Sequence, residues 1–346
     1  MVDNMNQVNR SQRPLRPKRK PRKTNFAPVM LALLIVSALL AGFTFAGGGY
    51  GGNSANAFAP LAPSSSEMTC YALSDYPSEI PVDIYSTNVI MIDADSGKLI
   101  FEMDSSEEVA PASLTKIMTA IVAIENIGDL DEEFTFDSET IDYLRSENAS
   151  VAGFAEGETV TARDLLYAAL LPSGGDGAIG LAVLVGGSID NFVDMMNGKA
   201  AELGLRHTHF VNPTGLDADG QYSSAYDICA LFRYALANKD FMSIESSYFY
   251  TSTETDEHPD GIEMESTVYA GITNNDISAD YIIGGKTGYT GNARLCLATY
   301  AEYEGKHYIL VTMGAGEGSN KPQYNFFDMD TIYSYYFSLI EQGSAE

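Results

Sequence analysis

The chain has 346 residues, of which 45% are hydrophobic and 19% charged, a composition typical of globular proteins that excludes an intrinsically disordered chain. Its formal net charge is −27 at pH 7. Residues 1–26 hold eight of the 20 basic residues and one acidic residue, so the rest of the chain holds 12 basic and 46 acidic residues. A surface this acidic repels phosphate backbones and excludes nucleic acid as a partner.

The beginning of the chain is basic and then apolar. Residues 1–26 predict a cytoplasmic segment, and residues 27–46 form a weakly polar stretch long enough to cross a bilayer. Because basic residues stay on the cytoplasmic side of a span, we predict that the acidic domain lies on the extracytoplasmic side of a bacterial cell membrane. Two interpretations stay open for residues 27–46: a retained transmembrane anchor that holds the protein at the cytoplasmic membrane, and a cleaved export signal that releases it.

Residues 47–85 are predicted to form a flexible linker, because their first part is rich in Gly, Ala, Ser, Pro and Asn. The folded domain is predicted over residues 86–342. The chain has three cysteines, Cys70, Cys229 and Cys296, and none of them has metal-ligand spacing. We therefore predict no metal and no cofactor. Buried thiols are expected, with one disulfide as the open alternative.

Two β-strands open the predicted domain, at residues 89–93 and 98–102, and a turn joins them. The first strand is apolar on both faces, which indicates a central strand covered on both sides. Helical periodicity then marks the middle of the chain. Helices are predicted at residues 113–127, from the N-cap candidate Thr161 onward, and at residues 177–185, 189–203 and 224–238.

The C-terminal part of the chain returns to strands. A short strand at residues 281–284 leads into Lys286, and residues 294–300 and 307–313 predict a hairpin. A closing helix is predicted at residues 328–342. Strands at both ends of the domain flank a helical middle. This order predicts an α+β fold, in which an antiparallel β-sheet is flanked by helices and carries a helical subdomain.

Ser113 and Lys116 lie three residues apart at the start of the first predicted helix. Residues three apart share one face of a helix, so the Lys116 amine should reach the Ser113 hydroxyl. A nucleophilic serine needs such a base, and burial with a second cation, for which Lys286 is the candidate, lowers a lysine pKa enough for that role. Alone, the pair has a simpler explanation, because Ser-x-x-Lys is common and serine often caps helices.

The tripeptide Lys286-Thr287-Gly288 follows a predicted strand. The Lys286 charge and the Thr287 hydroxyl suit a carboxylate, and Gly288 allows an extended peptide to join the strand edge. Gly284 and Gly285 indicate a close approach by another backbone or a ligand. Alone, the tripeptide is equally consistent with the end of an edge strand.

Together these segments resemble the low-molecular-mass penicillin-binding proteins, which are serine D-Ala-D-Ala carboxypeptidases. Their working set is a serine–lysine pair, a serine loop and a Lys-Thr-Gly strand, in that order. The resemblance covers about residues 86–342 and implies a β-lactamase/transpeptidase-like fold. Five stretches carry it, at residues 92–98, 111–120, 164–167, 210–216 and 285–290.

The resemblance implies an acyl-enzyme mechanism on peptidoglycan stem peptides, which β-lactams mimic. Ser113 would attack the D-Ala-D-Ala carbonyl, and Lys116 would take its proton. Ser173, in the serine loop, would relay a proton to the leaving amine. Water would then release the shortened peptide.

The resemblance also implies which residues bind the substrate. Lys286 and Thr287 would hold the terminal carboxylate, next to the strand edge at Gly288. The backbone N–H groups of Ser113 and Tyr289 would form the oxyanion hole, which usually makes a large contribution to such chemistry.

Three departures from the family pattern stand out. Gly175 replaces the asparagine of the serine loop, whose amide braces the lysine and binds the substrate carbonyl. Thr214 occupies a position where histidine is usual. The arginine often found near the last helix is absent around Gln323 and Tyr324. Arg294 either compensates for it or has a surface role.

Two alternatives to the carboxypeptidase stay open. A β-lactamase would need a dedicated deacylating carboxylate, and no motif for one stands out between Ser173 and Lys286. A catalytically weakened relative would bind wall peptide or antibiotic as a scaffold or sensor. Gly175 favours this second alternative, whereas the intact pair of Ser113 and Lys116 favours an enzyme.

Overall fold

The structure is a computed structural model that describes residues 82–147, 149–316 and 323–343. The predicted basic segment 1–26, the predicted span 27–46 and most of the predicted linker lie outside the described residues, as does Cys70. Cys229 and Cys296 are buried free thiols. Burial raises the pKa of Cys296 to about 12, so this thiol stays protonated and unreactive at neutral pH.

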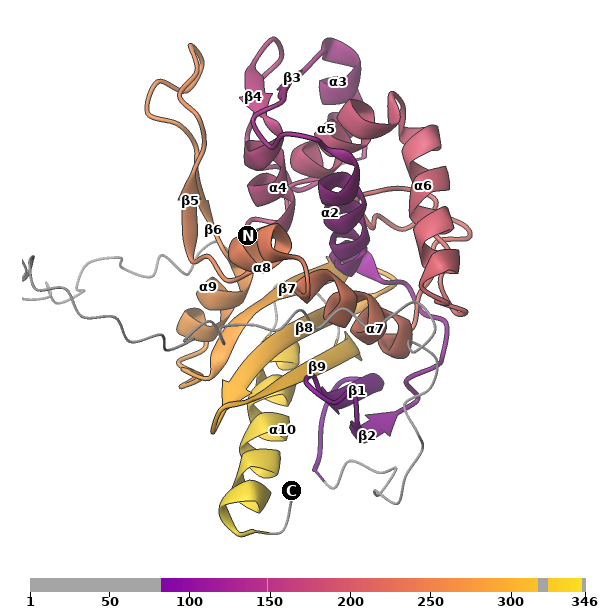
Figure 1. The fold of residues 1–346 in the computed structure, drawn as a ribbon, viewed down its shortest axis with the longest axis vertical. Coiled ribbons are helices and arrows are strands. Elements are labelled where there is room, and N and C mark those ends of the chain that lie inside the picture. Colours follow the sequence, from indigo (N-terminus) through magenta and orange to yellow (C-terminus); the bar gives the residue numbers. More distant parts are fainter. Residues whose placement is uncertain (1–81, 148, 317–322, 344–346) are drawn as a thin grey trace, which may run out of the picture. The chain divides into compact units, whose positions relative to one another are not determined.

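Five strands form an antiparallel sheet, in the order β2-β1-β9-β8-β7 (Figure 1). The first two strands come from the beginning of the domain and the other three from its end, which confirms the predicted strands and the C-terminal hairpin. β7, which carries the Lys-Thr-Gly tripeptide, forms one edge of the sheet. The strands are β1 (Asn88–Asp93), β2 (Leu99–Met103), β7 (Ile282–Thr290), β8 (Arg294–Tyr303) and β9 (Lys306–Ala315).

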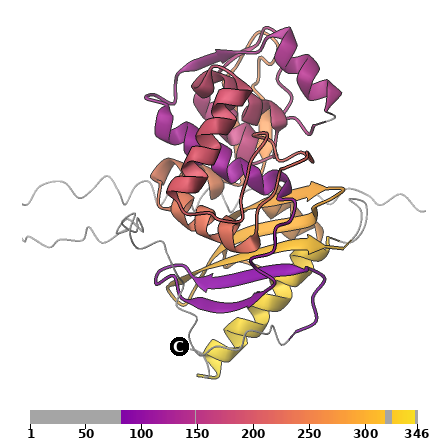
Figure 2. The ribbon, with the colours of Figure 1, turned by 90° about the vertical axis from the view of Figure 1, so that its right-hand side faces the viewer.

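Alternate residues of β1 pack into two separate apolar clusters. Ile90 and Ile92 belong to the cluster on the helical side of the sheet. Val89 and Met91 belong to the cluster between the sheet and α10 (Tyr324–Glu341). Figure 2 shows the sheet between the helical region above and α10 below. The prediction that this strand is covered on both faces is therefore confirmed. Each such aliphatic side chain contributes about 1.5–3 kcal/mol through burial.

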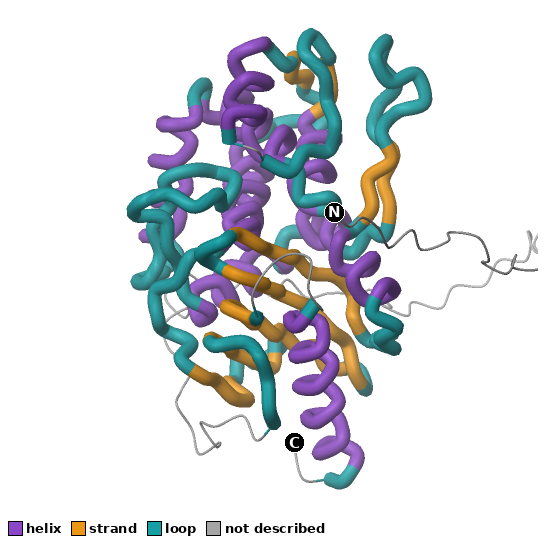
Figure 3. The backbone as a smooth tube through the Cα atoms, turned by 180° about the vertical axis from the view of Figure 1, so that it is seen from behind, coloured by secondary structure: helices purple, strands orange, loops and turns teal. Residues whose placement is uncertain are grey.

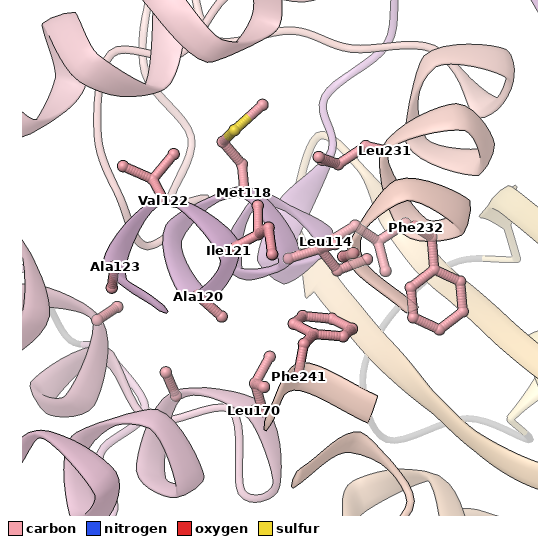
Figure 4. Close-up of a cluster of buried hydrophobic side chains, with 14 of the residues drawn as sticks. Leu114, Met118, Ala120, Ile121, Val122, Ala123, Leu170, Leu231, Phe232 and Phe241 are labelled. Atoms are coloured by element: carbon pink, nitrogen blue, oxygen red, sulfur yellow. The ribbon is translucent and has the colours of Figure 1, made fainter. Parts of the chain in front are cut away.

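α2 (Thr115–Asn126) runs through the middle of the helical region, and ten of its residues are buried. Figure 4 shows its apolar side chains meeting those of three other helices. Leu170 reaches the cluster from α4 (Ala162–Leu170), Phe232 from α7 (Ala225–Leu236) and Phe241 from α8 (Lys239–Glu245). The predicted helix is thus the core of this region, and the residues before it are fixed by that packing.

The remaining elements surround α2 and the sheet. α7 and α8 lie between the helical region and the sheet, on the face opposite α10 (Figure 1). Two short antiparallel two-stranded sheets, β3 with β4 and β5 with β6, extend from the helical region. These elements are η1 (Ala112–Leu114), β3 (Glu133–Thr135), α3 (Ser138–Ser146), β4 (Thr159–Thr161), α5 (Gly175–Gly186), α6 (Ile189–Glu202), β5 (Phe249–Thr251), β6 (Glu263–Glu265) and α9 (Thr267–Asn274).

A membrane-spanning helix is not found within the described ranges. No single helix there is long and apolar enough to cross a bilayer, although α5 and α6 pass the same test as a pair, with an 88° bend between them.

α10 covers the back of the sheet, as Figure 3 shows from behind. Phe326, Met329 and Tyr333 are fully buried there, against side chains of β8 and β9. The Asp328 carboxylate also accepts hydrogen bonds from the backbone N–H groups of Tyr85, at 2.9 Å, and Ser86, at 2.7 Å. The beginning of the described chain is therefore fastened to its last helix.

Local sequence signals set several boundaries correctly. Thr161 and Asp164 form the predicted capping box at the start of α4. Several boundaries differ from the prediction. Ser113 lies in the short 3-10 segment η1 and not in the α-helix itself, and the last helix begins at Tyr324 and not at residue 328. The strand predicted at residues 281–284 continues to Thr290, so the Lys-Thr-Gly tripeptide lies within β7 and does not follow it. The two short two-stranded sheets and the helices α3, α8 and α9 were not predicted, because their periodic segments are short.

Candidate functional site

Ser113 and Lys116 meet at the junction of η1 and α2. Lys116 Nζ lies 2.9 Å from Ser113 Oγ and donates to the carbonyl oxygen of Thr214 at 2.7 Å. Burial and the nearby charge of Lys286 hold the pKa of Lys116 well below its usual range, and Asp176 opposes this shift. A neutral amine in contact with a hydroxyl can accept its proton, so the geometry provides a nucleophile with a general base.

The loop at residues 212–216 supplies the second acceptor for Lys116. Asn212 Oδ1 accepts hydrogen bonds from the backbone N–H groups of Thr214, at 3.1 Å, and Gly215, at 2.8 Å, and so fixes the turn. Gly215 has φ +84°, and a Cβ there would collide with the carbonyl oxygen of Ala112. Only glycine allows this close approach, which places the Thr214 carbonyl over the Lys116 amine.

Both serines of the site lie in or next to left-handed backbone. Ala112, directly before Ser113, has φ 47°, and Ser173 itself has φ 64°. A non-glycine residue in this region costs about 1–3 kcal/mol. The surrounding packing therefore maintains two unfavourable conformations, and both of them aim a hydroxyl at a buried lysine.

Ser173 and Lys286 form the second polar pair. Lys286 Nζ donates to Ser173 Oγ at 2.8 Å and to the carbonyl oxygen of Thr287 at 3.0 Å. The Lys286 side chain is fully buried, and this burial lowers its pKa to about 8 while the charge of Glu245 opposes the shift. Ser150 Oγ donates to the Ser173 carbonyl at 3.0 Å and holds the serine loop in place.

The edge strand β7 lies directly against the nucleophile. A Cβ at Gly288 would lie 3.2 Å from the backbone nitrogen of Ser113, so glycine allows the strand to approach η1. Tyr289 follows at the strand edge with 39% of its surface exposed. The hydroxyl oxygen Oγ1 of Thr287 lies 2.7 Å from Oγ1 of Thr267 at the start of α9.

A pocket of about 490 Å³ adjoins Thr287 and α9. Carboxamides are prominent among its lining side chains, and none of the described residues that line it carries a charge. The arginine that many relatives place near the last helix has no counterpart in this lining. Arg294 is exposed at the beginning of β8 and does not line the pocket. The lining residues are Thr267, Ala270, Gly271, Asn274, Asn275, Thr287, Gly288, Tyr289, Leu295, Gln323, Asn325 and Phe326.

Gly175 is the first residue of α5, and its N–H donates to the Ser150 carbonyl at 2.6 Å. A Cβ at this position would lie 3.1–3.3 Å from atoms of Ala149, Ser150 and Leu144. The nearest neighbours of an added side chain thus come from α3 and the loop after it, and not from the Ser113–Lys116 pair. The Thr214 carbonyl already supplies Lys116 with an acceptor besides Ser113.

Two contributors to the site were missed in the sequence. No sequence pattern marks the Thr214 carbonyl, because every residue has a backbone carbonyl group. Glu245, near the end of α8, is 2% exposed, and burial raises its pKa to about 8 while Lys286 opposes that shift. The sequence feature that points to Glu245 is its position four residues after the buried Phe241, which places an acidic side chain on the apolar face of the helix. Within the described chain, no group of three or more potential metal-ligating side chains occurs.

Comparison with known sequences gives a consistent result. The profile of a family described as D-alanyl-D-alanine carboxypeptidase matches residues 75–317. The chain is 34% identical to the D-alanyl-D-alanine carboxypeptidase DacF of Bacillus subtilis over 230 residues, which are 66% of this chain and 57% of the relative's length. It is 33% identical to DacB2 of Mycobacterium tuberculosis, a protein with the same description, over 260 residues, which are 74% of this chain and 84% of the relative's length.

Solved structures share the fold. A DD-transpeptidase from Streptomyces superimposes with a TM-score of 0.68 at 26% identity, over 77% of this chain and all of the other. A D-alanyl-D-alanine carboxypeptidase from Mycobacterium tuberculosis superimposes with a TM-score of 0.67 at 30% identity, over 77% of this chain and 97% of the other.

Proposed function

The chain belongs to the D-alanyl-D-alanine carboxypeptidase family, and on that premise we propose that it is a serine D-Ala-D-Ala carboxypeptidase that trims peptidoglycan stem peptides and is acylated by β-lactams. The observation that carries this proposal is the contact of 2.9 Å between Ser113 Oγ and a buried Lys116 amine of lowered pKa. The names of the solved relatives include both a carboxypeptidase and a transpeptidase. These two reactions share the acyl-enzyme and differ in whether water or an amine accepts the acyl group.

Acylation begins when Ser113 Oγ attacks the carbonyl carbon of the penultimate D-Ala and Lys116 takes the hydroxyl proton. The negative oxygen of the tetrahedral intermediate is held by the backbone N–H groups of Ser113 and Tyr289. The contact between Gly288 and the Ser113 nitrogen supports this assignment, because it brings the two backbones together. The carbon–nitrogen bond then breaks, Ser173 relays to the leaving amine the proton that Lys116 took from Ser113, and D-Ala leaves. Water then attacks the ester carbonyl and gives a proton to Lys116. Lys116 returns this proton to Ser113 Oγ as the ester bond breaks, so the shortened peptide leaves as a carboxylic acid and the Ser113 hydroxyl is restored.

Binding of the terminal carboxylate is assigned to Thr287 and to the charge of Lys286. Lys286 is fully buried, so its charge acts through Ser173 and the neighbouring strand and not by direct exposure to solvent. The peptide aligns along the edge of β7 at Gly288 and Tyr289, where an added strand can form hydrogen bonds.

The enzyme acts on the extracytoplasmic side of the cell membrane, where peptidoglycan is found. The basic residues 1–26 followed by the apolar residues 27–46 support this location, with residues 27–46 as an anchor or a cleaved signal. A reporter enzyme that is active only outside the cytoplasm is expected to be active when it is fused after Glu346. Reporter activity confined to the cytoplasm would contradict this topology.

The decisive experiment measures release of D-alanine from a D-Ala-D-Ala pentapeptide, together with labelling by a fluorescent penicillin. Wild-type protein is expected to do both, and Ser113→Ala neither. Ser146→Ala, which changes an exposed serine at the end of α3, is the matched control and should behave as wild type.

Labelling without D-alanine release would instead support the weakened scaffold or sensor. Rapid release of hydrolysed penicillin would support a β-lactamase. A penicillin adduct on the Ser113→Ala protein, seen by intact-mass spectrometry, would overturn the assignment of the nucleophile.

A further inference from the structure

Glu245 is a buried carboxyl group that the proposed reaction does not use. It lies near the end of α8 and is 2% exposed. Among the described residues its Oε1 atom is buried and has no hydrogen-bond partner. A buried, unsatisfied oxygen on an acidic side chain is costly, so its presence calls for a compensating interaction.

The neighbouring strand β7 brings a positive charge toward this carboxyl group. α8 lies beside β7 (Figure 1), and a Cβ on Gly284 would stand 2.5 Å from the Glu245 carbonyl oxygen. Side chains two residues apart leave a strand on the same face. Lys286 therefore leaves β7 on the face that Gly284 presents to the end of α8. The glycine gives α8 room to approach, and the lysine beside it provides the opposite charge.

The charges around this pair are few. Lys286 faces Glu245 from β7, and Lys116 on α2 lies close enough to Lys286 for their charges to interact. The carboxylate of Asp176 is engaged by backbone N–H groups of the neighbouring loop, among them those of Ala152 at 2.9 Å and Gly153 at 2.8 Å. Tyr269, on α9, also lies near Glu245. Burial raises the pKa of Tyr269, and Tyr248 and the charge of Glu245 raise it further.

We propose that Glu245 is a positioning residue of the site: its carboxylate keeps Lys286 in the ammonium form that donates to Ser173, and so maintains the charge on the strand that receives the substrate. This inference rests on the proposed function for its catalytic consequence, but the pairing itself does not. Without a counter-charge, a buried ammonium next to a second lysine would lose its proton more readily. Burial raises the pKa of Glu245 and lowers that of Lys286, and the charge of each group opposes the shift of the other.

The first test is the pH profile of penicillin acylation at Ser113. Glu245→Gln keeps the size of the side chain and removes its charge, so the alkaline limb should move to lower pH by about one unit. Asp240→Asn removes an exposed carboxylate from the same helix, and its alkaline limb should coincide with that of the wild type. A folded Glu245→Gln protein with an unmoved limb would overturn the proposal, because Glu245 would then be a neutral filler.

The second test reads stability alone and needs no activity. Urea unfolding at pH 7 is measured for Glu245→Gln, Lys286→Met and the double variant. If the two groups compensate each other, the double variant should lose less stability than the sum of the two single losses. Additive losses would contradict the pairing. If Glu245→Gln alone does not fold, folding of the double variant supports the proposal, and its failure to fold contradicts it.

The two tests also separate this inference from the proposed function. A wild-type protein that penicillin does not acylate would contradict the proposed function. In that case the double-mutant cycle would still decide whether Glu245 and Lys286 form a pair.

Discussion

The two faces of the central sheet are stabilised in different ways. Toward α10, large side chains such as Phe326, Met329 and Tyr333 fill an apolar and aromatic cluster. On the side of α2 and α8 lie two buried lysines, Lys116 and Lys286. The backbone there is strained at one functional serine and directly before the other. The first face follows the ordinary rules of packing, whereas the second departs from them where the chemistry is proposed. Stability and reactivity should therefore respond to substitutions on different faces.

The largest expected effect is on the reactive face. Lys116→Gln removes the proposed base and should slow penicillin acylation by about 10²–10⁴-fold. Lys306→Gln, at an exposed position in the β8–β9 turn, is the matched control and should leave the rate unchanged. Stopped-flow acylation measures the rates, with circular dichroism to confirm folding. A folded Lys116→Gln protein within threefold of the wild-type rate would contradict the assignment.

The opposite pattern is expected on the face toward α10. Met329→Ala removes a fully buried side chain and should lower the free energy of unfolding by about 2–5 kcal/mol. The acylation rate per folded molecule should stay at the wild-type value, because no atom of the site is touched. Urea unfolding combined with titration of acylated Ser113 measures both quantities. A loss of rate in the folded fraction would show that the two faces are not independent.

The pH dependence should report the two lysines separately. Below the pKa of Lys116 its ammonium cannot accept the Ser113 proton, so acylation falls as the pH falls; the lowered pKa places this limb below the usual lysine range. Above pH about 8 Lys286 loses its proton, so acylation should fall again as the pH rises. Stopped-flow acylation from pH 5 to 10 should give a bell-shaped profile. A rate that still rises above pH 9 would contradict the role of a charged Lys286.

The smallest effect is expected at Gly175. Gly175→Asn restores the amide that relatives carry, and Gly175→Ala adds the same Cβ without it. Both should lose about 1–3 kcal/mol of stability, because the Cβ lies 3.1–3.3 Å from its neighbours. Only asparagine offers a new hydrogen bond, which should make its acylation about tenfold faster than that of the alanine variant. Equal rates for the two would show that the missing amide does not limit this site.

Sequence patterns predicted the parts of this molecule that depend on local spacing. The separation of Ser113 and Lys116, the capping box at Thr161 and the alternation in β1 each involve neighbouring residues, and each is present in the structure. The Thr214 carbonyl and the Glu245 carboxylate could not be predicted in this way. They reach the site through contacts between segments distant in sequence, and neither belongs to a local pattern. The effect of Gly175 on Lys116 stays a prediction, although the Thr214 carbonyl gives Lys116 an acceptor that no local pattern marks.

The pairing of β1 with β9 has a consequence for how the protein is made. Asn88 lies opposite Met313 and Asp93 opposite Tyr308, so the sheet joins the beginning of the domain to its end. At roughly 5–20 residues per second, a ribosome needs on the order of 10–40 s to synthesise the chain between these partners. During this interval β1 and β2 have only each other, and a lone hairpin is marginally stable in water. The sheet of a chain predicted to leave the cytoplasm thus stays incomplete until its last strand has been made.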